Sequence, residues 1–402
     1  MNVILSTGIL ICTGYILGEI AEKARLPRIS GYILAGILLN PDLLGIMSGQ
    51  FVDQTGPLLT ISLSVITFSI GGTLSAGKLK KTGKNMLILM LFESLTAFVV
   101  VFLLVFLSLY FLLDLFGSLN IIIAVCLVLA SLAAPTDPSA TLAVIHEYRA
   151  RGPVSSAMLE IAAFDDVMGI ILFTFITAFA TLLLGETSPE TGQIFLDLGK
   201  GIGGALLLGV ITGLIFNLIV RMFKKQSEGS LIVSTLGLIL LCYGISEFFG
   251  CESLIATMTL GVMVTNFNPQ SEKILTLIER YTDELIFVIF FSLSGLHLQL
   301  ASIQGSLLVI IVFIIARTLG KFTGIYAGSG LLHADPKVRK YAAGGLIPQG
   351  GIVIGLALLL TKDPAFEPVA STIIGIVIGV ALVHEITGPV SSRFSLKKAG
   401  EI

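Results

Sequence analysis

Long apolar runs separated by short polar segments recur along the whole chain. Because about 17–25 apolar residues are needed to cross a ~30 Å hydrocarbon core, the pattern predicts about thirteen transmembrane helices. The predicted spans are 3–22, 30–47, 57–76, 86–113, 120–145, 154–184, 201–220, 230–249, 252–266, 283–300, 305–332, 342–361 and 368–390. The first span lacks the basic leader and the cleavage site of a signal peptide, so we interpret it as a helix of the bundle.

Two of the spans contain helix breakers. The fifth contains Pro135 and Pro138 around Thr136-Asp137, and the twelfth contains Pro348-Gln349-Gly350. Proline removes a backbone donor and clashes with the preceding turn, and unwound backbone at membrane depth is tolerated only inside protein or beside a wet cavity. Both segments therefore predict a buried polar site.

The positions of the two breaks predict an internal symmetry. Span 12 follows span 5 by seven spans, and an odd offset turns the second break upside down relative to the first. This arrangement is typical of the inverted repeats of secondary transporters, in which two broken helices cross near the membrane midplane. A pair of ordinary proline kinks is the alternative interpretation.

The basic residues orient the predicted bundle. Of the 24 lysines and arginines, 20 lie in the segments on one side of the predicted bundle, the side that follows the odd-numbered spans at the start of the chain. Lys200 and Lys362 lie on the opposite side, and Arg317 and Lys321 lie inside a span. By the positive-inside rule the N-terminus is outside and the C-terminus inside.

The composition excludes a soluble protein. Hydrophobic residues make up 55% of the 402 residues and charged residues 12%, and the mean hydropathy is +0.99, whereas a soluble domain has about 25% charged residues. The fold class predicted is therefore an all-α polytopic membrane protein, in the cell membrane of a prokaryote. The four histidines and four cysteines show no metal spacing or CxxC pair, so we expect no cofactor, no enzyme activity and no nucleic-acid partner.

Adjacent acids interrupt the sixth span. Asp165 and Asp166 lie in an otherwise apolar stretch, where a central Asp costs roughly 2.5–3.5 kcal/mol on insertion scales, so intramembrane acids indicate ion or proton pathways. Sodium prefers oxygen ligands. A carboxylate that binds either a cation or a proton, and is carried across the membrane in both states, exchanges one for the other.

Two basic residues lie inside the eleventh span. Arg317 and Lys321 are four residues apart and share a helical face. A buried cation needs a partner, so each is expected to pair with an intramembrane carboxylate. Snorkelling to the interface is the alternative. Glu93 and Glu385, in spans that flank the broken helices, are interpreted as structural acids that are worth testing.

Four motifs in order carry a family resemblance over essentially the whole chain. They are Arg25-Leu-Pro-Arg-Ile-Ser-Gly-Tyr-Ile-Leu-Ala-Gly36, Thr136-Asp137-Pro138, Asp165-Asp166 and Gly320-Lys321-Phe-Thr-Gly324. With them the chain resembles the membrane domain of the monovalent cation/proton antiporters, and most of all the bacterial sodium/proton antiporters of the NapA type.

The resemblance implies roles for individual residues. Asp166 would bind Na⁺ or the proton, and Asp165 would be the partner that releases Lys321, with Arg317 as a second charge partner. Thr136 and Asp137 would line the site, and the paired aspartates imply electrogenic exchange. The chain departs from many relatives at Gln349-Gly-Gly351, where they have an acid. Kef-type potassium efflux systems are also similar, but they have Gln before the Asp.

The resemblance also implies a homodimer with a dimerisation part and a mobile core. We expect one antiporter domain over residues 1–402, with the dimerisation part mainly in 1–76 and 230–270 and the core mainly in 84–184 and 283–390. No soluble regulatory domain is expected. The predicted function is Na⁺/H⁺ antiport, with Li⁺ as a possible second ion. Potassium/proton antiport, or a channel or sensor on the same scaffold, is the alternative.

Overall fold

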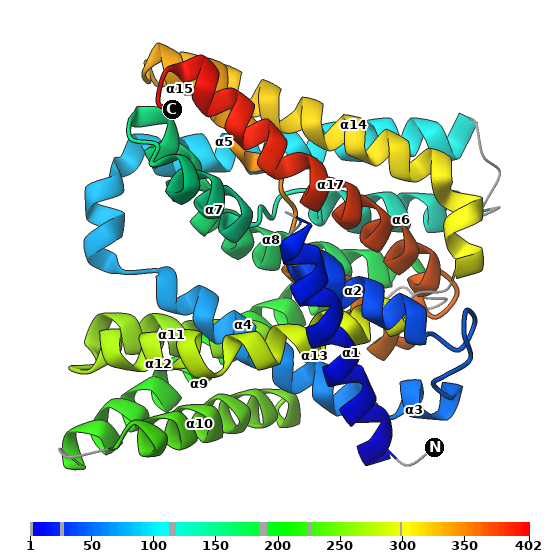
Figure 1. Ribbon diagram of the computed structural model, residues 1–402, viewed down its shortest axis with the longest axis vertical. Helices are drawn as coiled ribbons and strands as arrows, with labels where there is room; N and C mark the ends of the chain where they lie inside the picture. The colour runs from blue at the N-terminus through cyan, green and yellow to red at the C-terminus, as the bar shows by residue number, and fades with distance from the viewer. Residues whose placement is uncertain (1–2, 25–27, 112–117, 185–190, 224–226, 298–299) are drawn as a thin grey trace.

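The computed structural model describes residues 3–24, 28–111, 118–184, 191–223, 227–297 and 300–402, and this part of the chain is all-helical (Figure 1). The α-helices are α1 (Val3–Lys23), α2 (Arg28–Leu39), α3 (Gly49–Asp53), α4 (Gly56–Thr73), α5 (Ala76–Phe111), α6 (Leu119–Ser131), α7 (Pro138–Tyr148), α8 (Pro153–Leu184), α9 (Thr191–Met222), α10 (Glu228–Phe248), α11 (Ser253–Phe267), α12 (Ser271–Tyr281), α13 (Asp283–Leu296), α14 (Leu300–Leu331), α15 (Pro336–Tyr341), α16 (Gly351–Leu359) and α17 (Ala370–Ala399). Three 3₁₀ segments, η1 (Ala342–Leu346), η2 (Leu360–Lys362) and η3 (Pro364–Phe366), complete the set in this part of the chain.

Each predicted span contains a helix, which confirms the predicted fold class. Among the described residues, eight helices are long and apolar enough to cross a membrane, and four shorter apolar helices accompany them. Helix α2 ends at Leu39, earlier than the predicted 30–47, because Pro41 disfavours helical backbone at Asn40. Helix α5 bends at Gly83, where φ is 80°, a conformation that favours glycine; its apolar span begins there.

Both predicted breaks are present. Residues 132–137 separate α6 from α7, and residues 347–350 separate η1 from α16. Pro138 starts α7, where its missing N–H costs nothing because the first turn has no helical acceptor. The glycines at 344 and 345 allow close packing of η1, since a Cβ at Gly344 would lie 1.9 Å from Ser395 Oγ.

The helix packing follows the predicted inverted repeat. An offset of seven spans relates α1 to α10, α2 to α11, α4 to α13, α5 to α14 and α8 to α17. Accordingly, α2 packs on α13 as α11 packs on α4, and α1 packs on α13 as α10 packs on α4. Helices α5 and α14, which are related to each other, run side by side over much of their length (Figure 1).

The helices form two packing groups. The first contains α1, α2, α4 and α9–α13; the second contains α5–α8 and α14–α17 together with η1. Helix α13 packs mainly on α2 and α4, so it belongs to the first group, and the second group continues from α14. The assignment of dimer contacts and ion transport to these groups stays a prediction.

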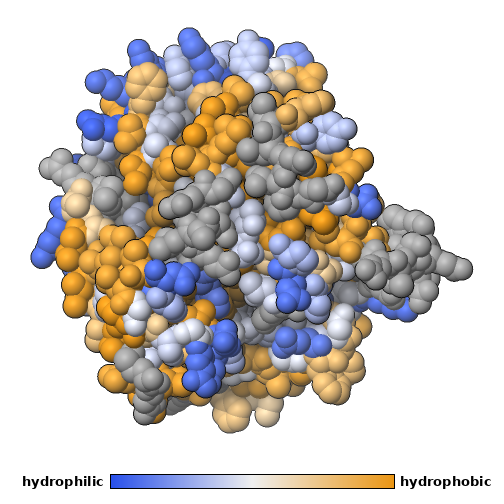
Figure 2. Space-filling view, turned by 90° about the vertical axis from the view of Figure 1, so that its right-hand side faces the viewer, coloured by the Kyte–Doolittle hydropathy of each residue, from blue (hydrophilic) through white to orange (hydrophobic). Residues whose placement is uncertain are grey.

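The surface has the character of a membrane protein. Exposed apolar residues follow one helix face on α5 (Leu95, Val99, Leu103) and another on α14 (Ile311, Ile315). Figure 2 shows apolar side chains over much of the face toward the viewer. The N-terminus lies at the lower right and the C-terminus at the upper left of Figure 1. Which end faces the cytoplasm stays a prediction.

Candidate functional site

The two unwound segments bind each other through backbone and side-chain hydrogen bonds. The Asp137 amide donates to the Pro348 carbonyl at 3.0 Å, and the Gln349 side-chain amide donates to the Leu132 carbonyl at 2.7 Å. Gly350 lies against Asp137, where a Cβ would be only 2.8 Å from Asp137 Cβ. The crossing is therefore a closely packed, defined structure.

Helix α8 packs against the same crossing one helical turn after Asp165 and Asp166. A Cβ on Gly169 would lie 2.2 Å from Pro135 Cγ, so only glycine permits this contact. All five residues predicted at the crossing, Pro135, Pro138, Pro348, Gln349 and Gly350, lie in or directly beside the two unwound segments. The proline ring of the first break thus positions the helix that carries Asp165 and Asp166.

Arg317 lies fully buried between the breaks. Its guanidinium donates to the carbonyls of Ala133 at 2.9 Å, Pro135 at 2.7 Å, Ile347 at 2.7 Å and Leu346 at 3.3 Å. These carbonyls follow α6 and end η1, where helix geometry leaves acceptors unpaired and partial negative charge accumulates. The expectation of a carboxylate partner for Arg317 was wrong: among the described residues its hydrogen bonds go to backbone oxygens. Snorkelling is excluded by its complete burial.

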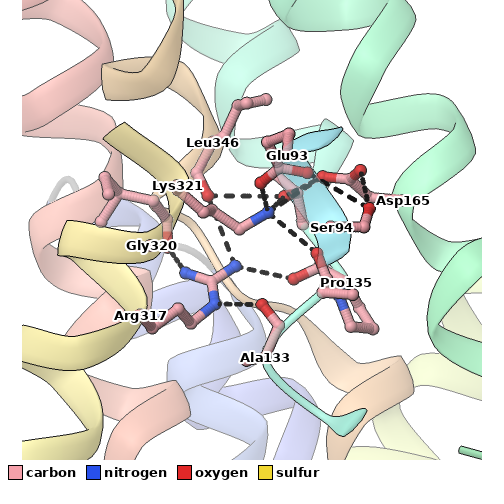
Figure 3. A network of polar contacts seen from close by, with 12 residues as sticks. Glu93, Ser94, Ala133, Pro135, Asp165, Arg317, Gly320, Lys321 and Leu346 are labelled. Carbon is pink, nitrogen blue, oxygen red and sulfur yellow. Dashed lines mark hydrogen bonds and ion pairs between the residues drawn. The ribbon is translucent and has the colours of Figure 1, made fainter. Parts of the chain in front are cut away.

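Lys321, one helical turn further along α14, binds carboxylates. Its ammonium contacts Glu93 directly and lies 3.0 Å from Asp165 Oδ2. It also donates to the Ala134 carbonyl and to Thr136 Oγ1, both at 2.9 Å. Figure 3 shows Lys321 directed toward Glu93 and Asp165, and Arg317 directed toward Ala133 and Pro135. The three charged side chains of this cluster are fully buried.

Asp165 and Asp166 have different surroundings although they are neighbours in sequence. Asp165 accepts hydrogen bonds from Thr136 at 2.6 Å and Ser94 at 3.3 Å, in addition to the Lys321 contact. Asp166 is only half-buried, and its Oδ1 is a buried oxygen with no hydrogen-bond partner among the described residues. Adjacent helical side chains point about 100° apart, so one acid is held by the cluster and the other is available to a ligand.

Thr136 and Asp137, also predicted site residues, have separate contacts. Thr136 Oγ1 accepts from Lys321 and donates to Asp165. Asp137 is 9% exposed, and it packs against Gly350 of the second break. The structure thus places Thr136 in the Lys321 cluster and Asp137 at the crossing.

Two side chains contribute more to the site than their positions in the sequence predicted. Glu93, interpreted as structural, is an ion-pair partner of Lys321, and Ser94 donates to both Glu93 and Asp165 at 3.3 Å. His384 was set aside for lack of metal spacing, but its Nδ1 lies 3.0 Å from Gln349 Oε1. Its place on a span that flanks a broken helix was the available signal for Glu93. Nothing in the sequence pairs His384 with Gln349.

A cavity lies between the two packing groups, next to α8. Its volume is about 520 Å³. Phe164 and Met168 of α8 and Met90 of α5 line one side, and Leu74, Val262 and Asn266 line the other. In the described part of the chain, no three His, Cys, Asp or Glu side chains are arranged to hold one metal ion together. A cation at Asp166 would therefore need further oxygen ligands from backbone, hydroxyl groups or water.

Comparison with known proteins identifies the family. The family model described as "Sodium/hydrogen exchanger, transmembrane" matches residues 8–392. The Na⁺/H⁺ antiporter NhaH of Halobacillus dabanensis is 26% identical over 63% of this chain and 62% of that protein. Cation/H⁺ antiporter 18 of Arabidopsis thaliana is 25% identical over 90% of this chain and 45% of that protein. The chain therefore spans less than two thirds of the length of these relatives.

A solved structure has the same fold. The sodium proton antiporter MjNhaP1 of Methanocaldococcus jannaschii superposes with a TM-score of 0.78, covers 98% of both chains and is 19% identical. The resemblance inferred from the four motifs is thus confirmed at the level of the family. The chain belongs to the family of transmembrane sodium/hydrogen exchangers.

Proposed function

We propose that this protein exchanges a monovalent cation, Na⁺ in the first place, for protons across the cell membrane by alternating access. The observation that carries the proposal is the contrast between the two adjacent acids. Asp165 is fully occupied by Lys321, Thr136 and Ser94, whereas Asp166 keeps a buried oxygen without a hydrogen-bond partner. A buried carboxylate without a partner is stable only when it binds a proton or a cation, and competition between the two at Asp166 produces antiport.

The charges near Asp166 would determine which of the buried side chains carry a proton. Lys321 neutralises part of the negative charge of Glu93 and Asp165. When a cation reaches Asp166, the added positive charge favours release of a proton from this group of side chains. A second proton per cation would make the exchange electrogenic, as the paired aspartates imply.

Alternating access would arise from movement between the two packing groups. The cavity between the two groups is lined almost entirely by apolar side chains from both of them, and apolar surfaces can slide past each other. The second group, with the crossing and both acids, would move against α4 and α11. The first group would form a homodimer in the cell membrane, with residues 1–76 and 230–270 at the interface.

Transport in proteoliposomes tests this function. A pH gradient is imposed, and lumenal pH is followed after addition of Na⁺, Li⁺ or K⁺ to the wild type and to Asp166→Asn. We expect a cation-dependent collapse of the gradient that Asp166→Asn abolishes, because the amide cannot hold a proton or neutralise a cation. Asp42→Asn, which makes the same change at an exposed position, should transport normally.

The same assay separates the alternatives. A response only to K⁺ would replace sodium by potassium as the substrate. Passive conductance that survives Asp166→Asn would instead identify a channel or sensor, and would refute the assigned site.

A further inference from the structure

The chain passes from the first packing group to the second at two points. Helix α4 ends at Thr73 and leads into α5, and α13 ends at Leu296, before α14. We call these two points the exits. Because each exit is a covalent link between the groups, any movement of one group against the other acts on the chain there.

Each exit follows a close crossing of two helices of the first group. Gly36 and Gly295 lie against each other where α2 crosses α13, and a Cβ on either would overlap a backbone carbonyl of the other helix. Gly71 and Gly261 form the same kind of pair where α4 crosses α11. Backbone therefore packs directly on backbone, and the ends of α4 and α13 have little room to shift within the first group.

A polar side chain bonds to the end of the helix at each exit. Asn40 Nδ2 donates to the Leu296 carbonyl at 2.8 Å, and Thr265 Oγ1 donates to the Gly72 carbonyl at 2.6 Å. Carbonyls in the last turn of a helix have no partner within that helix, so these bonds satisfy them. The inverted repeat relates the two bonds. Each donor lies four residues after the crossing glycine of its own helix, and each acceptor directly follows the crossing glycine of the other.

Each exit has a further bond beyond the end of its helix. At the first exit, Asn266 donates to the Leu74 carbonyl at 2.9 Å and accepts from the Ala76 amide, the first of α5, at 2.6 Å. At the second exit, His297 Nε2 lies 2.9 Å from Thr55 Oγ1, directly before α4. The first group therefore holds the chain as far as Ala76 at one exit and His297 at the other.

The cavity between the two groups borders the first exit. Leu74, Ala76 and Asn266 line it together with Phe164 and Met168 of α8. The exit is thus located where the groups face each other without filling the space between them. A displacement of α8 can change this space while the bonds of Asn266 stay in place.

We propose that Asn40, Thr265 and Asn266 anchor the two exits to the first group and are positioning residues for transport. The proposal rests on the antiport function above and names the side chains that keep the first group fixed while the second moves. With an anchored exit, the second group is displaced as a whole, whereas with a loose exit the ends of α4 and α13 would follow it. The inverted repeat would place the two anchors at opposite faces of the membrane.

The Na⁺ dependence of exchange in proteoliposomes tests the anchors. Thr265→Val keeps the shape of the side chain without its hydroxyl group, and Asn40→Leu removes the amide at the other exit. We expect each variant to lower the maximal exchange rate by about fivefold, the equivalent of one ordinary hydrogen bond. The KM for Na⁺ should not change, because Asp166 is left in place. Thr265→Ser keeps the hydroxyl group and should exchange at nearly the wild-type rate.

Thr387→Val is the matched control, because this exposed threonine donates within its own helix. Thermal unfolding shows which variants are folded. Amide hydrogen exchange adds a test on the wild type alone: Ala76 should be protected equally with and without Na⁺, because its partner Asn266 does not leave it. A Na⁺-dependent change at this amide would show that the exit moves, and would overturn the proposal.

Three transport results would also overturn the proposal. The first is a wild-type rate in folded Thr265→Val and Asn40→Leu. The second is a Thr265→Ser protein as slow as Thr265→Val, since the hydroxyl group would then not matter. The third is a raised KM at an unchanged maximal rate, because the side chains would then act on ion binding. Each of these refutes the anchors alone, whereas a wild type that exchanges no cation refutes the antiport function itself.

Discussion

Two regions on one face of α14 use buried positive charge in different ways. We call the four carbonyls around Arg317 the carbonyl cage, and Glu93, Asp165 and Thr136 around Lys321 the carboxylate cluster. The cage contains only backbone oxygens of the two breaks, whereas the cluster contains two acids and a hydroxyl group. The cage therefore joins the two breaks, whereas the cluster brings charged side chains together.

The side chains suit these two tasks. Arginine has five donors in a rigid planar arrangement and stays charged, so it can bind several carbonyls at fixed positions. Lysine is a compact charge on a flexible stem, and it can change partners or lose its proton more readily. If Arg317 were replaced by lysine and Lys321 by arginine, neither side chain would fit its surroundings.

The largest effect is expected in the carbonyl cage. Arg317→Met removes the guanidinium donors from four buried carbonyls, and hydrogen bonds to charged groups contribute about 1.5–3 kcal/mol each. We expect a loss of more than about 5 kcal/mol, comparable with the whole stability of many proteins, and hence little folded protein. Yield and thermal unfolding in detergent measure the loss.

Two further variants show whether the loss of stability comes from the carbonyl cage. Arg317→Lys should also be unstable, because one ammonium cannot reach both breaks. Arg151→Met replaces an exposed arginine and should unfold at the wild-type temperature. A stable Arg317→Met protein would show that the crossing does not depend on the cage.

A smaller effect is expected in the carboxylate cluster. Lys321→Met leaves Glu93 and Asp165 without their cation, and loss of one partner from a buried pair costs about 3–5 kcal/mol. Because Glu93→Gln then removes one of the uncompensated charges, the double variant should be more stable than Lys321→Met by at least about 1 kcal/mol. Thermal unfolding of the wild type, both single variants and the double variant measures this coupling. Additive effects would mean that Lys321 and Glu93 are not coupled.

The sequence was sufficient for much of the fold and for part of the site. Apolar length predicted the spans, and Pro135, Pro138 and Pro348 predicted both breaks, because these signals are local. The partners of Arg317 were not predictable, since its four carbonyls come from segments brought together only by the crossing. Glu93 and Lys321 are similarly far apart in sequence, so only the packing of α5 on α14 shows their contact. Pro41 ends α2 early, because it disfavours helical backbone at Asn40. This local signal was missed, since the spans were predicted from the length of the apolar runs alone.

The smallest effect tests whether the carbonyl cage has a second support. Gln349 donates to the Leu132 carbonyl, one residue before the first carbonyl bound by Arg317, and it accepts from His384. Gln349→Leu should cost about 1–3 kcal/mol, the penalty for buried polar groups left unpaired, because both Leu132 and His384 lose their partner. His384→Leu in the same background should add little, since its bond is already lost. If the two substitutions were fully additive in thermal unfolding, Gln349 and His384 would act separately, and the bond between them would not support the crossing.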